Sequence, residues 1–188
     1  MSNPYKECKT YETSNFIIRL ITIDDAEGLL KCYSDVNSRP YFNSDMCTGN
    51  FNFNTIEEMK NSIIGWLGCY EREEFVRFSI VSKEENLAVG TIEMFGAIGV
   101  YKVNTGILRL DILSRYENEM YLSEIFSLCL EGFFEDFEVE RVITKAIPLA
   151  KERIGSLVGL GFEKYESPDR EDYYALSKKT TVLNGSYL

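Results

Sequence analysis

The chain has 188 residues, with 20 Lys and Arg against 30 Asp and Glu, and it contains no histidine. This length predicts a single domain that is large enough to bury a core. The lack of histidine excludes hydrolases with an imidazole base and most catalytic zinc sites, so we expect no metal. The net charge of −10 argues against nucleic-acid binding, which neutralises phosphates with Lys and Arg. It suits a cationic partner, or it is an ordinary solvated surface.

The sequence also predicts where the protein works. No run of about 18 apolar residues occurs, so we expect no membrane span. The first twenty residues lack the apolar stretch of a signal peptide. The five cysteines show no ligand spacing and are expected to be free thiols in a reducing cytoplasm. They are Cys8, Cys32, Cys47, Cys69 and Cys129.

The first half of the chain predicts strands and helices in alternation. Residues 1–14 are polar and aperiodic, which indicates a flexible arm. A β-branched strand over 15–22 leads into a helix whose apolar residues have helical spacing. An aromatic loop over 37–54 precedes a second helix, in which Thr55 and Glu58 form a capping-box pattern. The alternating segments 75–82, 87–95 and 105–113 then predict three antiparallel strands.

The second half changes to longer helical patterns. A buried stripe predicts a helix over 120–137, and 141–147 is a short buried strand. The next helix, 149–160, ends at Gly161, which is well placed for a left-handed cap. Two closing strands, 162–166 and 172–177, flank a turn, and residues 180–188 are expected to form a flexible tail.

This order of elements predicts an α+β fold in one domain over residues 15–179. Antiparallel strands followed by a βαβ crossover indicate a mixed, mostly antiparallel sheet of six to seven strands, with helices on both faces.

Three passages carry a resemblance to a known family. They are FIIRLITIDDAEGLLKCY, LAVGTIEMF and RVITKAIPLAKERIGSLVGLGFEKYE. Together they resemble the GNAT superfamily of acyl-CoA N-acyltransferases, in its ribosomal-protein and spermidine acetyltransferase branch, over nearly the whole chain. The resemblance implies an acetyl-CoA-dependent N-acetyltransferase that acts on a small amine, a polyamine or a protein N-terminus.

The resemblance also implies a cofactor site. In the family, strands four and five splay apart, the pantetheine arm pairs with backbone of strand four, and the pyrophosphate rests on N–H groups at the following helix. The matching residues of this chain are Leu110, Ile112, Leu113, Arg115, Asn118, Glu119, Met120, Tyr121 and Arg153.

The pyrophosphate loop of this chain departs from the family pattern. Family members have Arg/Gln-x-x-Gly-x-Gly/Ala, and the corresponding positions here are Glu117, Met120 and Leu122. The carboxylates of Glu117 and Glu119 would repel a pyrophosphate.

The helix that follows strand five departs as well. Ala150 replaces a frequent Asn, Arg153 replaces a Ser or Ala, and Leu157 replaces a frequent Tyr. Two hypotheses follow. Either backbone amides grip the cofactor with help from cations such as Arg115, Lys151 or Arg153, or the protein is a catalytically silent GNAT-like domain with a binding or regulatory role.

Without histidine, a carboxylate must act as base in acetyl transfer, directly or through water, and a tyrosine or cysteine as acid. Glu93 and Asp111 are the candidate bases, and Tyr121 is the candidate acid. Glu93 is equally consistent with a solvent-facing position. Asp111 shares its strand face with Arg109, which favours a salt bridge between them.

The acceptor site is expected beside the aromatic loop 41–53 and Trp66, although this loop could equally close the core. Carboxylates flanking the second helix suit a cationic amine or are a solvated face. These are Glu57, Glu58, Glu71, Glu73 and Glu74. A homodimer is compatible with either hypothesis.

Overall fold

The computed structural model describes residues 3–42, 51–96, 104–128, 132–168 and 170–178. Its described part forms one eight-stranded sheet in the order β1-β2-β3-β4-β5-β6-β8-β7. Only β5 and β6 are parallel neighbours, and every other pair is antiparallel. The strands are β1 Tyr11–Glu12, β2 Phe16–Leu20, β3 Val76–Ser82, β4 Leu87–Gly96, β5 Thr105–Ile112, β6 Arg141–Lys145, β7 Glu163–Ser167 and β8 Arg170–Ser177.

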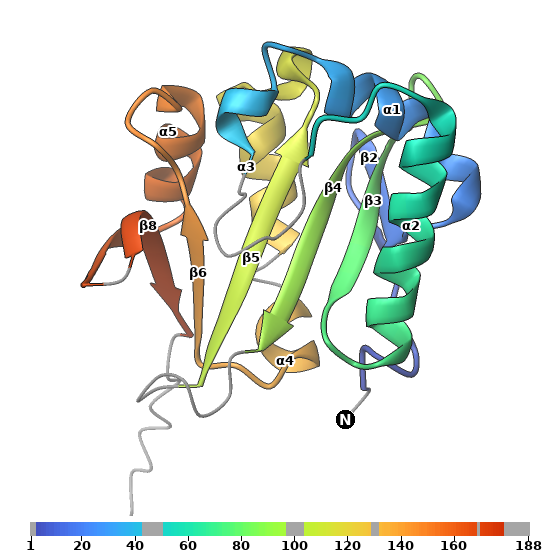
Figure 1. Cartoon of the computed structure of the whole chain (residues 1–188). Coiled ribbons are helices and arrows are strands. Elements are labelled where there is room, and N and C mark those ends of the chain that lie inside the picture. Colours follow the sequence, from blue (N-terminus) through green and yellow to red (C-terminus); the bar gives the residue numbers. More distant parts are fainter. Residues whose placement is uncertain (1–2, 43–50, 97–103, 129–131, 169, 179–188) are drawn as a thin grey trace, which may run out of the picture.

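Helices cover both faces of this sheet, which confirms the predicted α+β architecture (Figure 1). Helices α1 (Ala26–Ser34) and α2 (Ile56–Glu71) lie on one face, here called the front. Helices α3 (Glu119–Leu128) and α4 (Phe134–Asp136) lie behind, and α5 (Lys151–Gly159) packs beside α3. The predicted capping box of Thr55 and Glu58 begins α2.

The structure differs from the sequence prediction at the N-terminus. The expected arm over 1–14 contains β1, which pairs with β2 through Tyr11 and Ile18. This strand brings the sheet to eight strands instead of six to seven. The prediction missed it because two residues are too few to show alternation. The expected tail over 180–188 lies outside the described residues.

The predicted helical segment 120–137 contains α3 and α4, and residues 129–131 between them lie outside the described residues. The predicted helix 149–160 begins at Lys151. Gly161 follows α5 with φ of +90°, which confirms the predicted left-handed cap.

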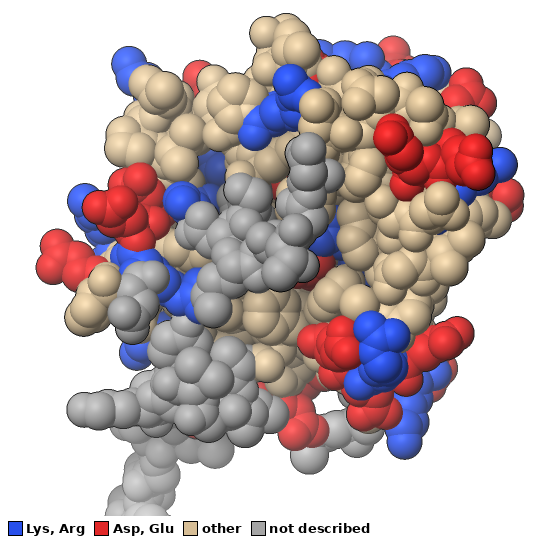
Figure 2. Space-filling model, in the orientation of Figure 1, with Lys and Arg blue, Asp and Glu red and all other residues tan. Residues whose placement is uncertain are grey.

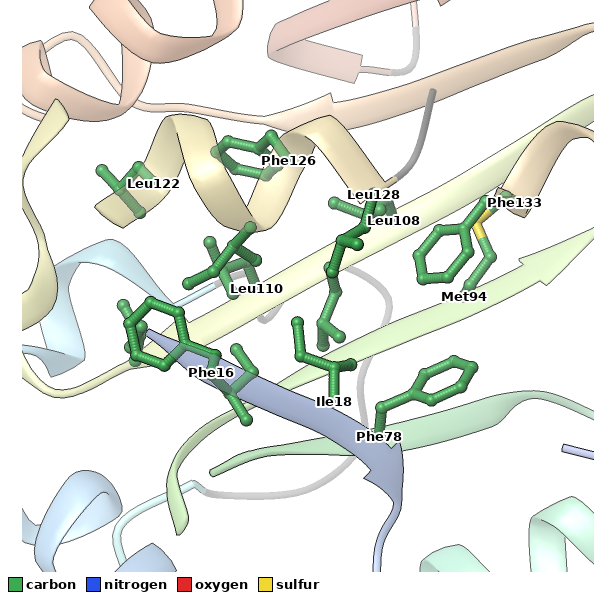
Figure 3. Close-up of a cluster of buried hydrophobic side chains, with 14 of the residues drawn as sticks. Phe16, Ile18, Phe78, Met94, Leu108, Leu110, Leu122, Phe126, Leu128 and Phe133 are labelled. Atoms are coloured by element: carbon green, nitrogen blue, oxygen red, sulfur yellow. The ribbon is translucent and has the colours of Figure 1, made fainter. Parts of the chain in front are cut away.

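The back of the sheet is the apolar core of the domain. Alternate residues of β2 to β5 point toward α3 and α4, where Phe126 and Phe133 pack against them (Figure 3). The labelled members of this cluster are Phe16, Ile18, Phe78, Met94, Leu108, Leu110, Leu122, Phe126, Leu128 and Phe133. The residues between them on the strands point to the front, and several of these are charged.

The parallel pair β5–β6 ends before the strands do. Its register runs from Thr105 opposite Arg141 to Leu108 opposite Thr144. Beyond Leu108, the backbone of β5 has no ladder partner on the β6 side among the described residues. We call this opening, between the end of β5 and the N-terminal end of α5, the β5–β6 cleft.

Candidate active site

The strand register builds two rows of polar side chains across the front of the sheet. Arg77 lies opposite Glu93, and Glu93 lies opposite Arg109. The next row along the strands joins Ser79, Thr91 and Asp111 in the same way. Alternation within each strand therefore places both rows on one face, beneath α1 and α2.

The first row is a buried ion-pair network. Arg77 Nε donates to Glu93 Oε2 at 3.0 Å, and Arg109 Nη1 donates to Glu93 Oε1 at 2.8 Å. The Glu93 side chain is 1% exposed, so the solvent-facing alternative for this residue is wrong. The Arg77 guanidinium also lies 4.1 Å from the Trp66 ring centroid. Arginines thus bind both carboxylate oxygens of Glu93, and the main role of Glu93 is to hold this network together.

The network keeps its buried arginine, Arg77, in the charged state. Burial alone would lower the pKa of Arg77, but Glu93, Tyr33 and Asp111 together outweigh burial and raise that pKa above its ordinary value. Arg77 therefore stays protonated and fixes Glu93 in place.

The second row presents Asp111 to Tyr33. The Tyr33 hydroxyl, on α1, donates to Asp111 Oδ2 at 2.9 Å and lies 2.8 Å from Thr91 Oγ1. Burial, and then the Asp111 charge, raise the pKa of Tyr33 well above its ordinary value. Tyr33 therefore remains a hydrogen-bond donor, and it orients the Asp111 carboxylate.

In place of the expected salt bridge between Asp111 and Arg109, each of these side chains faces a charged residue on another strand. Arg109 forms its ion pair with Glu93 on the neighbouring strand. Asp111 Oδ2 lies 3.9 Å from Arg77 Nη1. The reason is geometric, because directly opposed residues on paired strands lie closer than residues two apart on one strand.

Tyr121 lies on the other face of the sheet from Glu93 and Asp111. Its ring packs edge-on against Phe16 and Tyr116, with centroids 5.5 Å and 5.1 Å away. Phe16 belongs to the apolar core behind the sheet (Figure 3). The three predicted catalytic residues therefore do not converge. The tyrosine whose hydroxyl meets Asp111 is instead Tyr33, on α1.

The β5–β6 cleft holds the side chain of Arg153 from α5. Its Nη1 donates to the Leu110 carbonyl oxygen at 3.0 Å and to the Tyr41 carbonyl oxygen at 2.9 Å. Its Nε and Nη2 each donate to Glu117, both at 2.7 Å. The Arg153 and Glu117 side chains are 1% and 7% exposed. Arg153 thus binds the part of the β5 backbone that has no partner on β6.

The start of α3 is likewise engaged by the chain itself. The Glu119 N–H donates to Glu152 Oε2 at 3.0 Å, and the Tyr121 N–H donates to Asn118 Oδ1 at 3.2 Å. Ser156 Oγ on α5 donates to the Glu119 carbonyl at 3.1 Å. Side chains of α5 and of the loop before α3 therefore accept hydrogen bonds from two of the amides at the start of α3, those of Glu119 and Tyr121.

The remaining residues that the resemblance assigned to the cofactor are dispersed. Ile112 is buried in β5, and the Leu113 N–H donates to the Val89 carbonyl. Arg115 Nη2 lies 2.5 Å and 2.6 Å from the two Glu85 oxygens. Met120 is 62% exposed on the first turn of α3.

A small cavity remains beside these contacts. It has a volume of about 250 Å³ and is lined by Tyr41, Ser114, Glu117 and Lys151, among others. This is below the roughly 300–1,000 Å³ of ordinary small-molecule sites. Among the described residues, the buried Arg153 side chain lies against the Leu110 carbonyl, and we call this arrangement the closed cleft.

Within the described residues, neither the cysteines nor any metal-binding group forms part of this site. Cys32 is buried, and burial raises its pKa well above the ordinary value. Burial also raises the pKa of Cys8 to about 11. Cys47 and Cys129 lie outside the described residues. Across the described ranges no group of three or more potential metal-ligating residues occurs, and no helix there is long and apolar enough to cross a membrane.

The acidic residues near α2 are partly paired. Acidic and basic side chains lie intermixed toward the lower right of the surface in Figure 2. At the end of α2, Arg72 binds Glu74 with Nε–Oε1 at 2.7 Å. Glu58 accepts the Asn54 and Thr55 N–H groups as part of the helix cap. These two acids therefore have local roles in the structure.

The fold is shared with solved acetyltransferases, although no protein-family model and no curated protein sequence matches the chain. A GNAT-family acetyltransferase from Bacillus anthracis superposes with a TM-score of 0.67 at 20% identity, covering 90% of this chain and 98% of that one. The ribosomal-protein-S5-alanine acetyltransferase from Vibrio fischeri gives 0.69 at 17% identity, covering 90% and 97%.

RimJ from Mycobacterium smegmatis, solved in complex with CoA-disulfide, superposes with a TM-score of 0.70 at 12% identity, covering 89% of this chain and 86% of that chain. The protein therefore has the GNAT fold. At these identities the likeness establishes the fold alone.

Proposed function

We propose that the protein is an acetyl-CoA-dependent N-acetyltransferase with a primary amine as acceptor. The observation that carries the proposal is the placement of Asp111 at the end of β5, one residue after Leu110, where the β5–β6 ladder has already stopped. A carboxylate oriented by a buried tyrosine thus adjoins the cleft that gives the fold its acyl-CoA site. The structural likeness to acetyltransferases supports the same activity.

Acetyl-CoA, when bound, would supply a thioester: a bond forms between the amine nitrogen and the acetyl carbon, the carbon–sulfur bond breaks, and CoA leaves as the thiol after its sulfur takes up the proton that the nitrogen loses. The chain must remove a proton from the attacking nitrogen. We assign this to Asp111, directly or through water, with Tyr33 as the residue that positions it. Glu93 is less suited, because two arginines already occupy its oxygens.

The acceptor that fits the chain is cationic in solution. The net charge of −10 attracts an amine of this kind at long range. A small amine, a polyamine and a protein N-terminus share this chemistry, so all three belong in the test.

The experiment follows release of the CoA thiol from acetyl-CoA with spermidine, a small primary amine and a peptide with a free N-terminus. We expect Asp111→Asn to lower kcat by about 10²–10⁴-fold, the usual contribution of a general base. Asp24→Asn is the matched control, since it neutralises an exposed carboxylate. Equal rates for Asp111→Asn and the unmodified protein would remove Asp111 from this role.

The second candidate is a catalytically silent GNAT-fold domain with a binding or regulatory role. The closed cleft favours it, because Arg153 and Glu152 engage the backbone groups that a cofactor would need. Absence of acetyl-CoA binding at millimolar concentration, in the unmodified protein and in the opened variant described below, would favour this candidate over the enzyme.

A further inference from the structure

Arg153 is an unusual side chain for its position in the fold. It is 1% exposed, yet it reaches from α5 across the β5–β6 cleft to the Leu110 carbonyl oxygen, at 3.0 Å. A buried guanidinium is costly to desolvate unless its donors are satisfied. Here Glu117 takes two donors in a fork arrangement, and backbone carbonyls take others. Specific hydrogen bonds therefore stabilise the buried position of Arg153, which is not that of a loose surface side chain.

The contact joins the three walls of the cleft. Leu110 belongs to β5, Glu117 to the loop before α3, and Tyr41 to the 3₁₀ turn Arg39–Tyr41 after α1. One turn of α5 thus holds all three segments through one guanidinium. Glu152, the preceding residue, holds the Glu119 N–H at the same end. Both contacts use backbone groups that a ligand in the cleft would have to take over.

We infer that the Arg153–Glu117 pair is a built-in lock on the β5–β6 cleft, and that acyl-CoA binds only when α5 side chains leave it. This inference rests on the proposed function and describes how that function is regulated. The locked and open states differ in which partner the Leu110 carbonyl and the Glu119 N–H have. A ligand that needs these groups selects the open state.

The fraction of molecules in the open state determines how much the lock lowers the affinity for acyl-CoA. If the open state holds about 0.1–10% of the molecules, the apparent affinity of acyl-CoA is lowered about 10- to 1,000-fold. Removing the lock should recover that factor without any new contact to the ligand.

The test is calorimetric titration of the full chain with acetyl-CoA. The opened variant is Glu117→Gln/Arg153→Ser, which removes both charges together so that no unpaired charge is left buried. Arg72→Ser/Glu74→Gln is the matched control, because it removes an exposed Arg–Glu pair with similar fork geometry at the end of α2. Circular dichroism and thermal unfolding check that each variant is folded.

We expect the opened variant to bind acetyl-CoA at least about tenfold more tightly than the unmodified protein, and the control to bind unchanged. Equal or weaker binding by the folded, opened variant overturns the lock, while measurable binding by the unmodified protein leaves the proposed function standing. Tighter binding without thiol release for any amine keeps the lock and overturns the proposed function. No binding by either protein overturns both.

If the double variant fails to fold, Arg153→Lys supplies the same test. It keeps the charge but loses the fork geometry toward Glu117 and the reach to two carbonyls. Tighter binding supports the lock, and unchanged or weaker binding by this variant contradicts it.

Discussion

Charged side chains lie in the middle of the sheet because the strand register gives each of them a partner. Glu93 sits between Arg77 and Arg109, one on each neighbouring strand. Arg19, on β2, lies opposite Ser79 and pairs with Asp25 of the 3₁₀ turn Ile23–Asp25, with Nη2–Oδ1 at 2.7 Å. A buried pair of this kind adds little net stability by itself, but removal of one partner leaves a charge without compensation.

We therefore expect Arg77→Met to lower the free energy of unfolding by about 3–5 kcal/mol, the usual cost of breaking a buried pair. The variant also loses the contact of the guanidinium with Trp66. Arg109→Met should cost less, because the Arg109 side chain is 15% exposed against 3% for Arg77. Urea unfolding measures both, and equal losses would contradict the assignment of Arg77 as the main partner of Glu93.

Asp35 is the residue whose ionisation should be visible in the stability of the protein. It follows α1 and accepts hydrogen bonds from Ser38 Oγ at 2.7 Å, the Asn37 N–H at 2.9 Å and the Ser114 N–H at 3.1 Å. Burial alone would raise its pKa, but these hydrogen bonds outweigh burial and lower the pKa from 3.8 to about 2. Asp35 thereby ties the end of α1 to the segment after β5.

A lowered pKa in the folded state means that the ionised carboxylate favours folding. Its stabilisation is complete above pH 4 and is lost as the pH falls from about 4 to about 2. After allowance for partial exposure, we expect on the order of 1–2 kcal/mol.

Urea unfolding of Asp35→Asn and of the unmodified protein at pH 7 and pH 2.5 tests this, because the variant lacks the titrating group. The stability difference between the two proteins should shrink toward the acid end. A difference that is constant with pH would show that Asp35 has no lowered pKa.

The close approach of helix α1 to strand β4 depends on a glycine. A Cβ at Gly28, on α1, would lie 2.2 Å from the Ala88 carbonyl oxygen and 2.9 Å from the Ala88 nitrogen on β4. These are backbone atoms, so the helix itself would have to move. The approach of α1 also sets the position of Tyr33 over Thr91 and Asp111.

We expect Gly28→Ala to lower the free energy of unfolding by about 1–3 kcal/mol, as overpacking does. Gly65→Ala on α2 is the control, since a Cβ there meets nothing within 4 Å. That substitution should raise stability by about 0.5–1 kcal/mol through helix propensity. Chemical unfolding of both variants decides, and an unchanged Gly28→Ala would mean that α1 is not held against β4 this closely.

The elements were predictable because their signals are local. Alternation in β3 to β5 and the capping box of α2 lie within a few residues each, and the structure confirms them. The ion pairs are different, because Arg77 and Glu93 are 16 residues apart and Glu117 and Arg153 are 36 apart. Register and helix docking determine such pairs, and the chain alone carries no signal for either. The assignment of Arg153 to a phosphate therefore stays a prediction, and the lock is an alternative to it.

The N-terminal segment is bound to α4, which is distant from it in the sequence. Lys9 and Tyr11 both bind Asp136 on α4, and the Tyr11 hydroxyl lies 2.5 Å from Asp136 Oδ2. The Tyr11 ring packs edge-on against Phe78 and Phe133, with centroids 5.9 Å and 5.5 Å away. A segment without helical or strand periodicity thus closes one edge of the apolar core behind the sheet.

The Tyr11 ring should contribute strongly to stability because of this packing. Tyr11→Ala should lower the free energy of unfolding by about 3–5 kcal/mol, as loss of a large aromatic ring from a core does. Tyr11→Phe keeps the ring and loses only the hydrogen bond to Asp136, so it should cost about 1 kcal/mol. Urea unfolding of both variants separates packing from hydrogen bonding. If 1–14 were a flexible arm, as the sequence predicted, both variants would unfold at the same urea concentration as the unmodified chain.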